Sequence, residues 1–323
     1  MSFSSETKKG IAKIIPEDRC CMLAEIAGYT RIKGTLHLTG GGHLSVSLTA
    51  EDPAVVRTLK QLTSAYFDAS SEIRVIQGSL LKKENSYRLV FNEERTGEKI
   101  LRETGMLRVR DGSNVLTDGI DPEIIRKTCC KKACLRGLFL AGGTVNDPEK
   151  GYHLEIVCSD KVTAADVRKL MNQFSLKAKV IERRGSQVVY LKGSERVADF
   201  LKIIGAYNQV FRLEDVLALK SLRNKTNRIV NCENANLDRS VNAAAKQIRN
   251  IRYIQEHLGL ENIQKKLRDA AELRLEYPEL SLSELARLAD PPVSKSGLNH
   301  RFAKIAETAE HLREKRNQYE SSQ

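Results

Sequence analysis

Apolar positions along the first 205 residues follow two spacings, and the order of these spacings repeats once. Helical spacing covers Asp18 to Lys33, and it returns at Lys127 to Ala141. Each of these helices is followed by two short segments in which apolar and polar residues alternate, as they do in half-buried strands. A second helix, two more strands and a closing helix complete each set. The pattern therefore predicts two copies of an αββαββα unit.

The remaining predicted elements occupy equivalent places in the two copies. In the first copy they are Thr35–Leu38, Leu44–Leu48, Pro53–Phe67, Glu72–Ile76, Tyr87–Phe91 and Asn92–Glu103. In the second copy they are Thr144–Val145, His153–Cys158, Thr163–Phe174, Ala178–Glu182, Val188–Lys192 and Glu195–Ile204. The Gly40-Gly41-Gly42 run lies between two strands without a helix start behind it, so it predicts a hairpin tip rather than a nucleotide-binding loop.

The amino acids themselves also indicate a duplication. With an offset of 109 residues, CCMLAEIAGYTRIKGT (Cys20–Thr35) aligns with CCKKACLRGLFLAGGT (Cys129–Thr144), and six of the sixteen positions are identical. Each of these helices ends at a glycine, which suits a left-handed cap. A repeat of this length is a structural unit, so the repeats are expected at about 18–105 and 127–205.

The alternating pattern stops after Tyr207, and long helical periodicity replaces it. The expected organisation is a duplicated domain at 1–207, a basic asparagine-rich linker at 208–236 and a helical domain at 237–323. Within the helical domain, helices are expected at about 237–258 and 261–277. Asparagine side chains can contact DNA, although caps and turns are their more common use.

Residues 281–305 predict a helix-turn-helix. Ser281 and Glu284 have the spacing of a capping box, and Pro291-Pro292 ends the short helix that follows. In the second helix, Leu298, Phe302 and Ile305 share one face, while polar and basic residues lie on the other. The second helix of such a motif fits the major groove of DNA. An ordinary pair of packed helices is the alternative interpretation.

The charge balance points to an acidic polymer as partner. The 323 residues include 53 Lys and Arg against 41 Asp and Glu, which gives a net charge of +12. The alternative explanation is that these Lys and Arg side chains simply lie on solvated helix faces. The predicted contacts with double-stranded DNA are Ser294, Lys295, Ser296, Asn299, His300, Arg301 and Lys304 in the helix-turn-helix, with Arg223, Lys225, Arg228, Lys246 and Arg249 in the basic stretch.

The seven cysteines do not predict a disulfide framework or a metal site. Their number is odd, and Cys20-Cys21, Cys129-Cys130 and Cys134 lack the C-x2-C spacing of a closed zinc site. We interpret them as small buried apolar residues. No cofactor, metal or small-molecule substrate is expected. The chain also lacks a secretory signal and a membrane-spanning run, so a cytoplasmic, nucleoid-associated protein is expected.

The duplicated αββαββα pattern and its glycine-rich motif helices resemble the LAGLIDADG homing endonucleases. The motif falls on Leu135–Gly143 and on Ile26–Gly34. The resemblance implies that these helices pack along a pseudo-twofold axis, and that a metal-binding acid is required at the eighth position. Lys33 and Gly142 occupy that position, and neither side chain offers an oxygen ligand. Cleavage by this route is therefore not expected, although Asp147 or Glu155 could substitute.

The degenerate tandem domain, the basic connector and the helix-turn-helix together resemble the WhiA family over about residues 15–312. This resemblance implies a bacterial DNA-binding protein without enzymatic activity. Family members act in sporulation as transcription regulators beside an iron-sulfur partner, or in cell division and chromosome segregation. Either role, and a second transcription regulator as partner, is compatible with the sequence. An endonuclease with relocated metal ligands and a protein-interaction scaffold are the alternatives.

Overall fold

The computed structural model describes residues 2–38, 44–77 and 85–320, and the chain forms two compact units, Met1–Lys220 and Ser221–Gln323. Each unit buries its own hydrophobic core. The expected hairpin tip at Gly40-Gly41-Gly42 lies outside the described residues.

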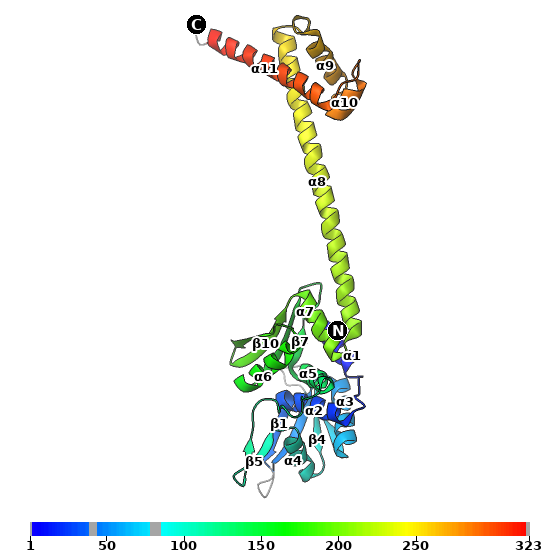
Figure 1. Cartoon of the computed structure of the whole chain (residues 1–323), viewed down its shortest axis with the longest axis vertical. Coiled ribbons are helices and arrows are strands. Elements are labelled where there is room, and N and C mark those ends of the chain that lie inside the picture. The colour runs from blue at the N-terminus through cyan, green and yellow to red at the C-terminus, as the bar shows by residue number, and fades with distance from the viewer. Residues whose placement is uncertain (1, 39–43, 78–84, 321–323) are drawn as a thin grey trace. The chain divides into compact units, whose positions relative to one another are not determined.

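The first unit contains both αββαββα copies, which confirms the predicted α+β class (Figure 1). The first copy consists of α2 (Arg19–Lys33), β1 (Gly34–Leu38), β2 (Leu44–Ala50), α3 (Pro53–Phe67), β3 (Ser71–Ile76), β4 (Ser86–Phe91) and α4 (Glu94–Glu103). The second consists of α5 (Thr128–Gly142), β7 (Gly143–Val145), β8 (His153–Cys158), α6 (Lys161–Asn172), β9 (Lys179–Arg183), β10 (Ser186–Lys192) and α7 (Ser194–Ile204). The strands of the two copies form two antiparallel sheets, ordered β1-β2-β4-β3 and β7-β8-β10-β9.

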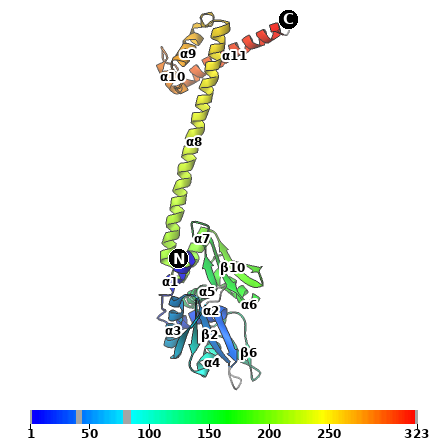
Figure 2. The same cartoon turned by 180° about the vertical axis from the view of Figure 1, so that it is seen from behind.

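The motif helices α2 and α5 lie side by side where the two copies meet (Figures 1 and 2). Glycine is required at their closest approach. A Cβ atom on Gly28 would overlap the carbonyl oxygen of Cys134, and a Cβ atom on Gly137 would overlap that of Glu25. The two backbones therefore touch directly, as the resemblance to the endonucleases implies.

The prediction of left-handed glycine caps on these two helices is wrong. The cap residues Gly34 and Gly143 have φ values of −74° and −81° and an extended backbone, because each helix runs straight into a strand. Glycine serves a steric purpose here. A Cβ atom on Gly34 would lie 2.5 Å from the carbonyl oxygen of Thr30, and one on Gly143 would overlap the Phe139 ring.

One helix and one β-hairpin of the first unit were not predicted. Helix α1 (Phe3–Ile11) forms in the polar N-terminal segment and buries Phe3, Thr7 and Ile11, which are spaced four residues apart. Strands β5 (Leu107–Arg110) and β6 (Ser113–Leu116) form a hairpin. The Asp111-Gly112 turn between them has positive φ at both residues, and Asp-Gly is a common hairpin turn, so the sequence did contain a signal for it.

The second unit is helical. Helix α8 (Tyr207–His257) begins in the first unit and continues into the second, followed by a 3-10 turn (Leu260–Asn262), α9 (Lys265–Glu276), α10 (Leu282–Leu288) and α11 (Lys295–Glu320). The predicted helix start near residue 237 is wrong, because 208–236 is helical throughout. The asparagines in this segment lower helix propensity, which explains the misplaced start. In the described ranges, no helix combines the length and apolar content needed to cross a membrane.

Candidate nucleic-acid interface

Helices α10 and α11 pack through a small core. Leu285 and Ala286 of α10 lie against the buried Leu298, Phe302 and Ile305 of α11. Leu298, Phe302 and Ile305 are the residues that the sequence pattern placed on the inner face of this helix. Residues Ile251 and Ile254 of α8 and Leu267, Ala270 and Ala271 of α9 belong to the same core. The seven-residue helix α10 is therefore held by packing against α8, α9 and α11 and not by its own propensity.

The turn between α10 and α11 is fixed by hydrogen bonds at each end. The predicted capping box is confirmed: the Ser281 backbone N–H donates to Glu284 Oε2 (2.8 Å), and the Glu284 N–H donates to Ser281 Oγ (3.3 Å). Val293 N–H donates to the Ala286 carbonyl (3.0 Å) and closes the turn. Ser294 Oγ then accepts from Gly297 N–H (3.0 Å) at the start of α11. The first turn of α11 is thereby set in place relative to α10.

Arg274 of α9 supports this motif on its inner side, and the sequence pattern did not indicate this role. Its side chain is 1% exposed, and its guanidinium donates to Gln247 Oε1 (3.0 Å) and to the Leu280 carbonyl (2.6 Å). The same group lies 5.6 Å from the ring centre of Phe302. It therefore joins α8, the loop before α10, and α11. An arginine in a charged helix resembles a surface residue, so no local pattern predicts this role.

Six of the seven predicted contacts in the helix-turn-helix are exposed together at the start of α11 and along its outer face. They are Ser294, Lys295, Ser296, Asn299, His300 and Lys304. Arg301 differs, because it is half-buried and lines a cleft together with Asp269, Glu272 and Glu276. These three carboxylates give Arg301 more acidic surroundings than those of the six exposed residues.

The five predicted basic contacts of α8 are all exposed but do not share one face. Lys225, Arg228 and Lys246 are separated by three and eighteen residues, which places them within about 60° of one another around a helix. Arg223 lies roughly 200° from Lys225, on a different side. We call Lys225, Arg228 and Lys246 the basic stripe; Arg249 lies about 60° from Lys246, at its margin.

The tips of the two motif helices carry no carboxylate. Lys33 lines a cleft with Lys8, Lys9 and Glu51, next to the end of α5. Burial lowers the pKa of Lys8 to about 8, while Glu51 opposes this shift and Lys33 adds to it. On the other tip, a Cβ atom on Gly142 would lie 2.7 Å from the Val157 carbonyl oxygen and 2.8 Å from Ile32 Cγ2. Lys33 thus places a cation at one tip, beside the acids Glu51 and Asp52 that line the same cleft, and the other tip has no room for a side chain.

The two acids that could have replaced the missing ligands are engaged elsewhere. Asp147 accepts from the Glu149 N–H (3.0 Å) and lies 3.7 Å from Arg212. Glu155 lies 3.4 Å from His153 Nε2 and 3.6 Å from Arg183. Among the described residues, neither acid belongs to a group of three or more metal-ligand side chains.

A buried ion pair connects α2 and α5. Glu25 is fully buried, and Arg136 donates two hydrogen bonds, of 2.6 and 2.9 Å, to its Oε2 atom. Burial raises the pKa of Glu25 to about 7, although the Arg136 charge acts in the opposite direction. This pair was not predicted from the sequence, where its signal was a charged residue within the apolar MLAEIAGY run of a helix predicted to be central.

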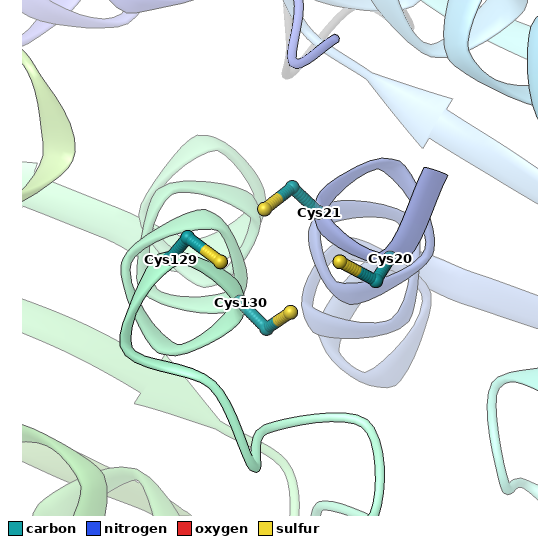
Figure 3. Close-up of side chains that lie close together, drawn as sticks. All are labelled: Cys20, Cys21, Cys129 and Cys130. Carbon is teal, nitrogen blue, oxygen red and sulfur yellow. The ribbon is translucent and has the colours of Figure 1, made fainter. Parts of the chain in front are cut away.

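The cysteines only partly follow the interpretation as buried apolar residues. Cys21, Cys130, Cys134 and Cys158 are buried, but Cys129 and Cys232 are exposed and Cys20 is half-buried. Cys20, Cys21, Cys129 and Cys130 meet at the start of α2 and α5, and they are the residues in the described ranges that could hold a metal ion (Figure 3).

Three family models together match most of the chain. The WhiA N-terminal LAGLIDADG-like domain matches residues 19–107, the WhiA LAGLIDADG-like domain matches 131–223, and the WhiA C-terminal HTH domain matches 226–309. The helix-turn-helix predicted from the sequence lies within the last match.

Similar proteins and a solved structure agree with these matches over nearly the full length. A "Probable cell division protein WhiA" of Alkaliphilus metalliredigens is 42% identical over 315 residues, covering 98% of this chain and 99% of the relative. One of Clostridium perfringens (strain 13 / Type A) is 44% identical over 313 residues, covering 97% and 99%. The crystal structure of "full-length DUF199/WhiA from Thermatoga maritima" is 27% identical, with a TM-score of 0.61 and coverage of 96% and 99%. The chain therefore belongs to the WhiA family.

Proposed function

We propose that this protein binds double-stranded DNA in a sequence-dependent manner and has no nuclease activity. The observation that carries the proposal is the exposed polar face of α11, held rigid by the capping box, the closed turn and Arg274. Asn299 and His300 can hydrogen-bond to base edges in the major groove, and Lys295 and Lys304 can contact phosphates. The basic stripe of α8 adds sequence-independent affinity.

The absence of cleavage is proposed from the motif helix tips. Two-metal hydrolysis of a phosphodiester needs oxygen ligands that hold cations beside the scissile phosphate. Lys33 has an ammonium group, and Gly142 packs against Val157 and Ile32. The carboxylates Asp147 and Glu155 are paired with cations instead. These observations favour a binding protein over an endonuclease with relocated ligands.

The biological setting is proposed from the relatives, which are named probable cell division proteins. We place the protein at the chromosome, as a regulator whose DNA binding serves cell division. The family resemblance also supports proposing a role in transcription during sporulation or in chromosome segregation, with a second regulator as partner. Footprinting with the full chain tests whether the duplicated domain contacts DNA or only other proteins: protection beyond the footprint of the helix-turn-helix would indicate DNA contact.

The test of base reading starts from duplexes selected from a random library with the full-length protein. We expect the double variant Asn299→Ala/His300→Ala to reduce the preference for the selected duplex over a scrambled one by roughly fivefold or more, because each good base contact contributes about 1–3 kcal/mol. Fluorescence anisotropy gives both affinities. His311→Ala is the matched control, an exposed histidine about three turns farther along α11. An unchanged preference in the double variant would contradict the assignment.

Cleavage is tested separately with supercoiled plasmid that carries the selected site, in the presence of Mg²⁺ or Mn²⁺. We expect the plasmid to stay supercoiled. Site-specific nicking that co-purifies with this chain through two chromatographic steps would refute the non-enzymatic part of the proposal, whatever the result for base reading.

A further inference from the structure

Four cysteine side chains converge at the start of the two motif helices. The sulfur atoms of Cys20, Cys21, Cys129 and Cys130 all lie within 4.8 Å of one another. Figure 3 shows the two cysteines of α2 and the two of α5 pointing toward a common centre between the helices. Zinc–sulfur bonds of about 2.3 Å put the corners of a tetrahedron about 3.8 Å apart, so a small inward movement completes such a tetrahedron.

The duplication explains why the four thiols meet. Each cysteine pair occupies the second and third positions of its helix, so the pairs are equivalent under the 109-residue offset. Because α2 and α5 touch at the equivalent positions Gly28 and Gly137, other equivalent residues along the two helices also lie near one another. Spacing along the chain cannot show this, because each helix contributes only two ligands.

The surroundings of the four cysteines act on their ionisation in both directions. Burial raises the pKa of the Cys21 and Cys130 thiols, so a bound cation has to displace their protons. The cysteines lie in the first turns of α2 and α5, where unpaired backbone N–H groups and the helix dipole stabilise negative charge. Neither Asp18 nor Lys127 caps its helix with a side-chain hydrogen bond, and neither first turn contains an acid. The Lys127 ammonium lies 4.0 Å from the Cys20 sulfur.

We propose that Cys20, Cys21, Cys129 and Cys130 bind one Zn²⁺ ion as a tetrathiolate site that links the two copies of the duplicated domain. Soft thiolate ligands in a tetrahedral set select zinc or a similar soft ion. Binding replaces four sulfur–hydrogen bonds with four sulfur–zinc bonds and releases four protons. The resulting centre has a net charge of −2, which the two helix N-termini and Lys127 offset. The exposed Cys129 gives the ion access from solvent.

The ion is expected to act as a structural clamp. It would fix the first turns of α2 and α5 at the end of the helix pair that lies opposite the altered motif tips. Since all four ligands come from the protein, no coordination position is left for a substrate, which is typical of structural zinc. This inference does not depend on the proposed DNA binding.

Full-length protein, purified under reducing conditions without chelators, tests the site by elemental analysis. We expect one zinc per chain, and replacement with Co²⁺ should give the thiolate-to-cobalt and d–d absorption bands of a tetrahedral sulfur site. Cys129→Ser should lower the zinc content to background and weaken Co²⁺ binding by at least about tenfold. Cys129→His should retain metal, because imidazole is also a zinc ligand.

Cys232→Ser is the matched control, since Cys232 is also exposed but lies outside the cluster; it should keep full metal content. Circular dichroism verifies that each variant is folded. Reduced, folded protein that takes up neither zinc nor Co²⁺ would overturn the proposal. So would stoichiometric iron with acid-labile sulfide, or peptide mapping that shows disulfides between the two cysteine pairs in freshly isolated protein.

Discussion

Glu25 shows at the scale of one residue how a buried charge is tolerated between the motif helices. Both hydrogen bonds from Arg136 reach Oε2, and Oε1 has no hydrogen-bond partner among the described residues. A carboxyl with one unpaired buried oxygen is costly in its ionised form. Its raised pKa, about 7, follows from this burial.

This shift predicts a pH dependence of stability. Between the ordinary carboxyl pKa of 4.5 and the folded value of about 7, the folded chain holds the Glu25 proton that the unfolded chain has lost. The stability that the protonated form contributes is therefore full below about 4.5 and is lost as the pH rises through about 7. We expect Glu25→Gln to remove this loss of unfolding free energy with rising pH, as measured by urea unfolding at several pH values.

Glu123→Gln is the control for that experiment, because Glu123 belongs to an exposed pair with Arg126. This variant should leave the pH dependence of the unfolding free energy as it is in the wild-type protein. If the unfolding free energies of the wild-type protein and Glu25→Gln changed equally between pH 5 and pH 8, Glu25 would titrate as an ordinary carboxyl.

At the scale of elements, the contact between α2 and α5 depends on glycine. We expect Gly137→Ala to lower the free energy of unfolding by about 1–3 kcal/mol or more, because the new methyl group would overlap the Glu25 carbonyl oxygen and force the helices apart. Chemical denaturation measures the loss.

The control, Gly10→Ala, makes the same change in a helix where the nearest atom is the flexible end of Gln209, at 3.4 Å. Alanine favours helix over glycine by up to about 1 kcal/mol, so this variant should be neutral or slightly more stable. If the two variants had the same stability, close packing could not explain the glycine at position 137.

At the scale of the whole molecule, the net charge of +12 is relevant to DNA only where cations share a face. The basic stripe of Lys225, Arg228 and Lys246 meets this condition, and Arg223 lies on another side of α8. The logarithm of the binding constant falls linearly with the logarithm of the salt concentration, and the steepness of this line, the salt slope, grows by about 0.9 for each phosphate contact.

We expect the double variant Lys225→Ala/Arg228→Ala to weaken binding to all duplexes alike and to reduce the salt slope by about 1–2. Titrations at several salt concentrations with selected and scrambled duplexes measure both effects. Arg223→Ala should change the slope less than either single variant of the stripe. A larger effect of Arg223→Ala would mean that DNA contacts the other side of the helix.

Local sequence patterns were enough to predict the repeated αββαββα order, the capping box and inner face of the helix-turn-helix, and the loss of acids at Lys33 and Gly142. These features are local: period, cap spacing and residue type need no knowledge of distant contacts. The Asp111-Gly112 hairpin was also available locally but was not predicted.

Which distant residues meet became evident only from the packing of the folded chain. The pairing of Glu25 with Arg136 and the support of the helix-turn-helix by Arg274 join positions without a shared sequence pattern. The positions of the basic residues on different faces of α8 were also not predictable, because the asparagine-rich segment was not expected to be helical. The meeting of four cysteines from two helices required the packing of one repeat on the other, because ligand geometry is set by the contact between helices and not by spacing along either one.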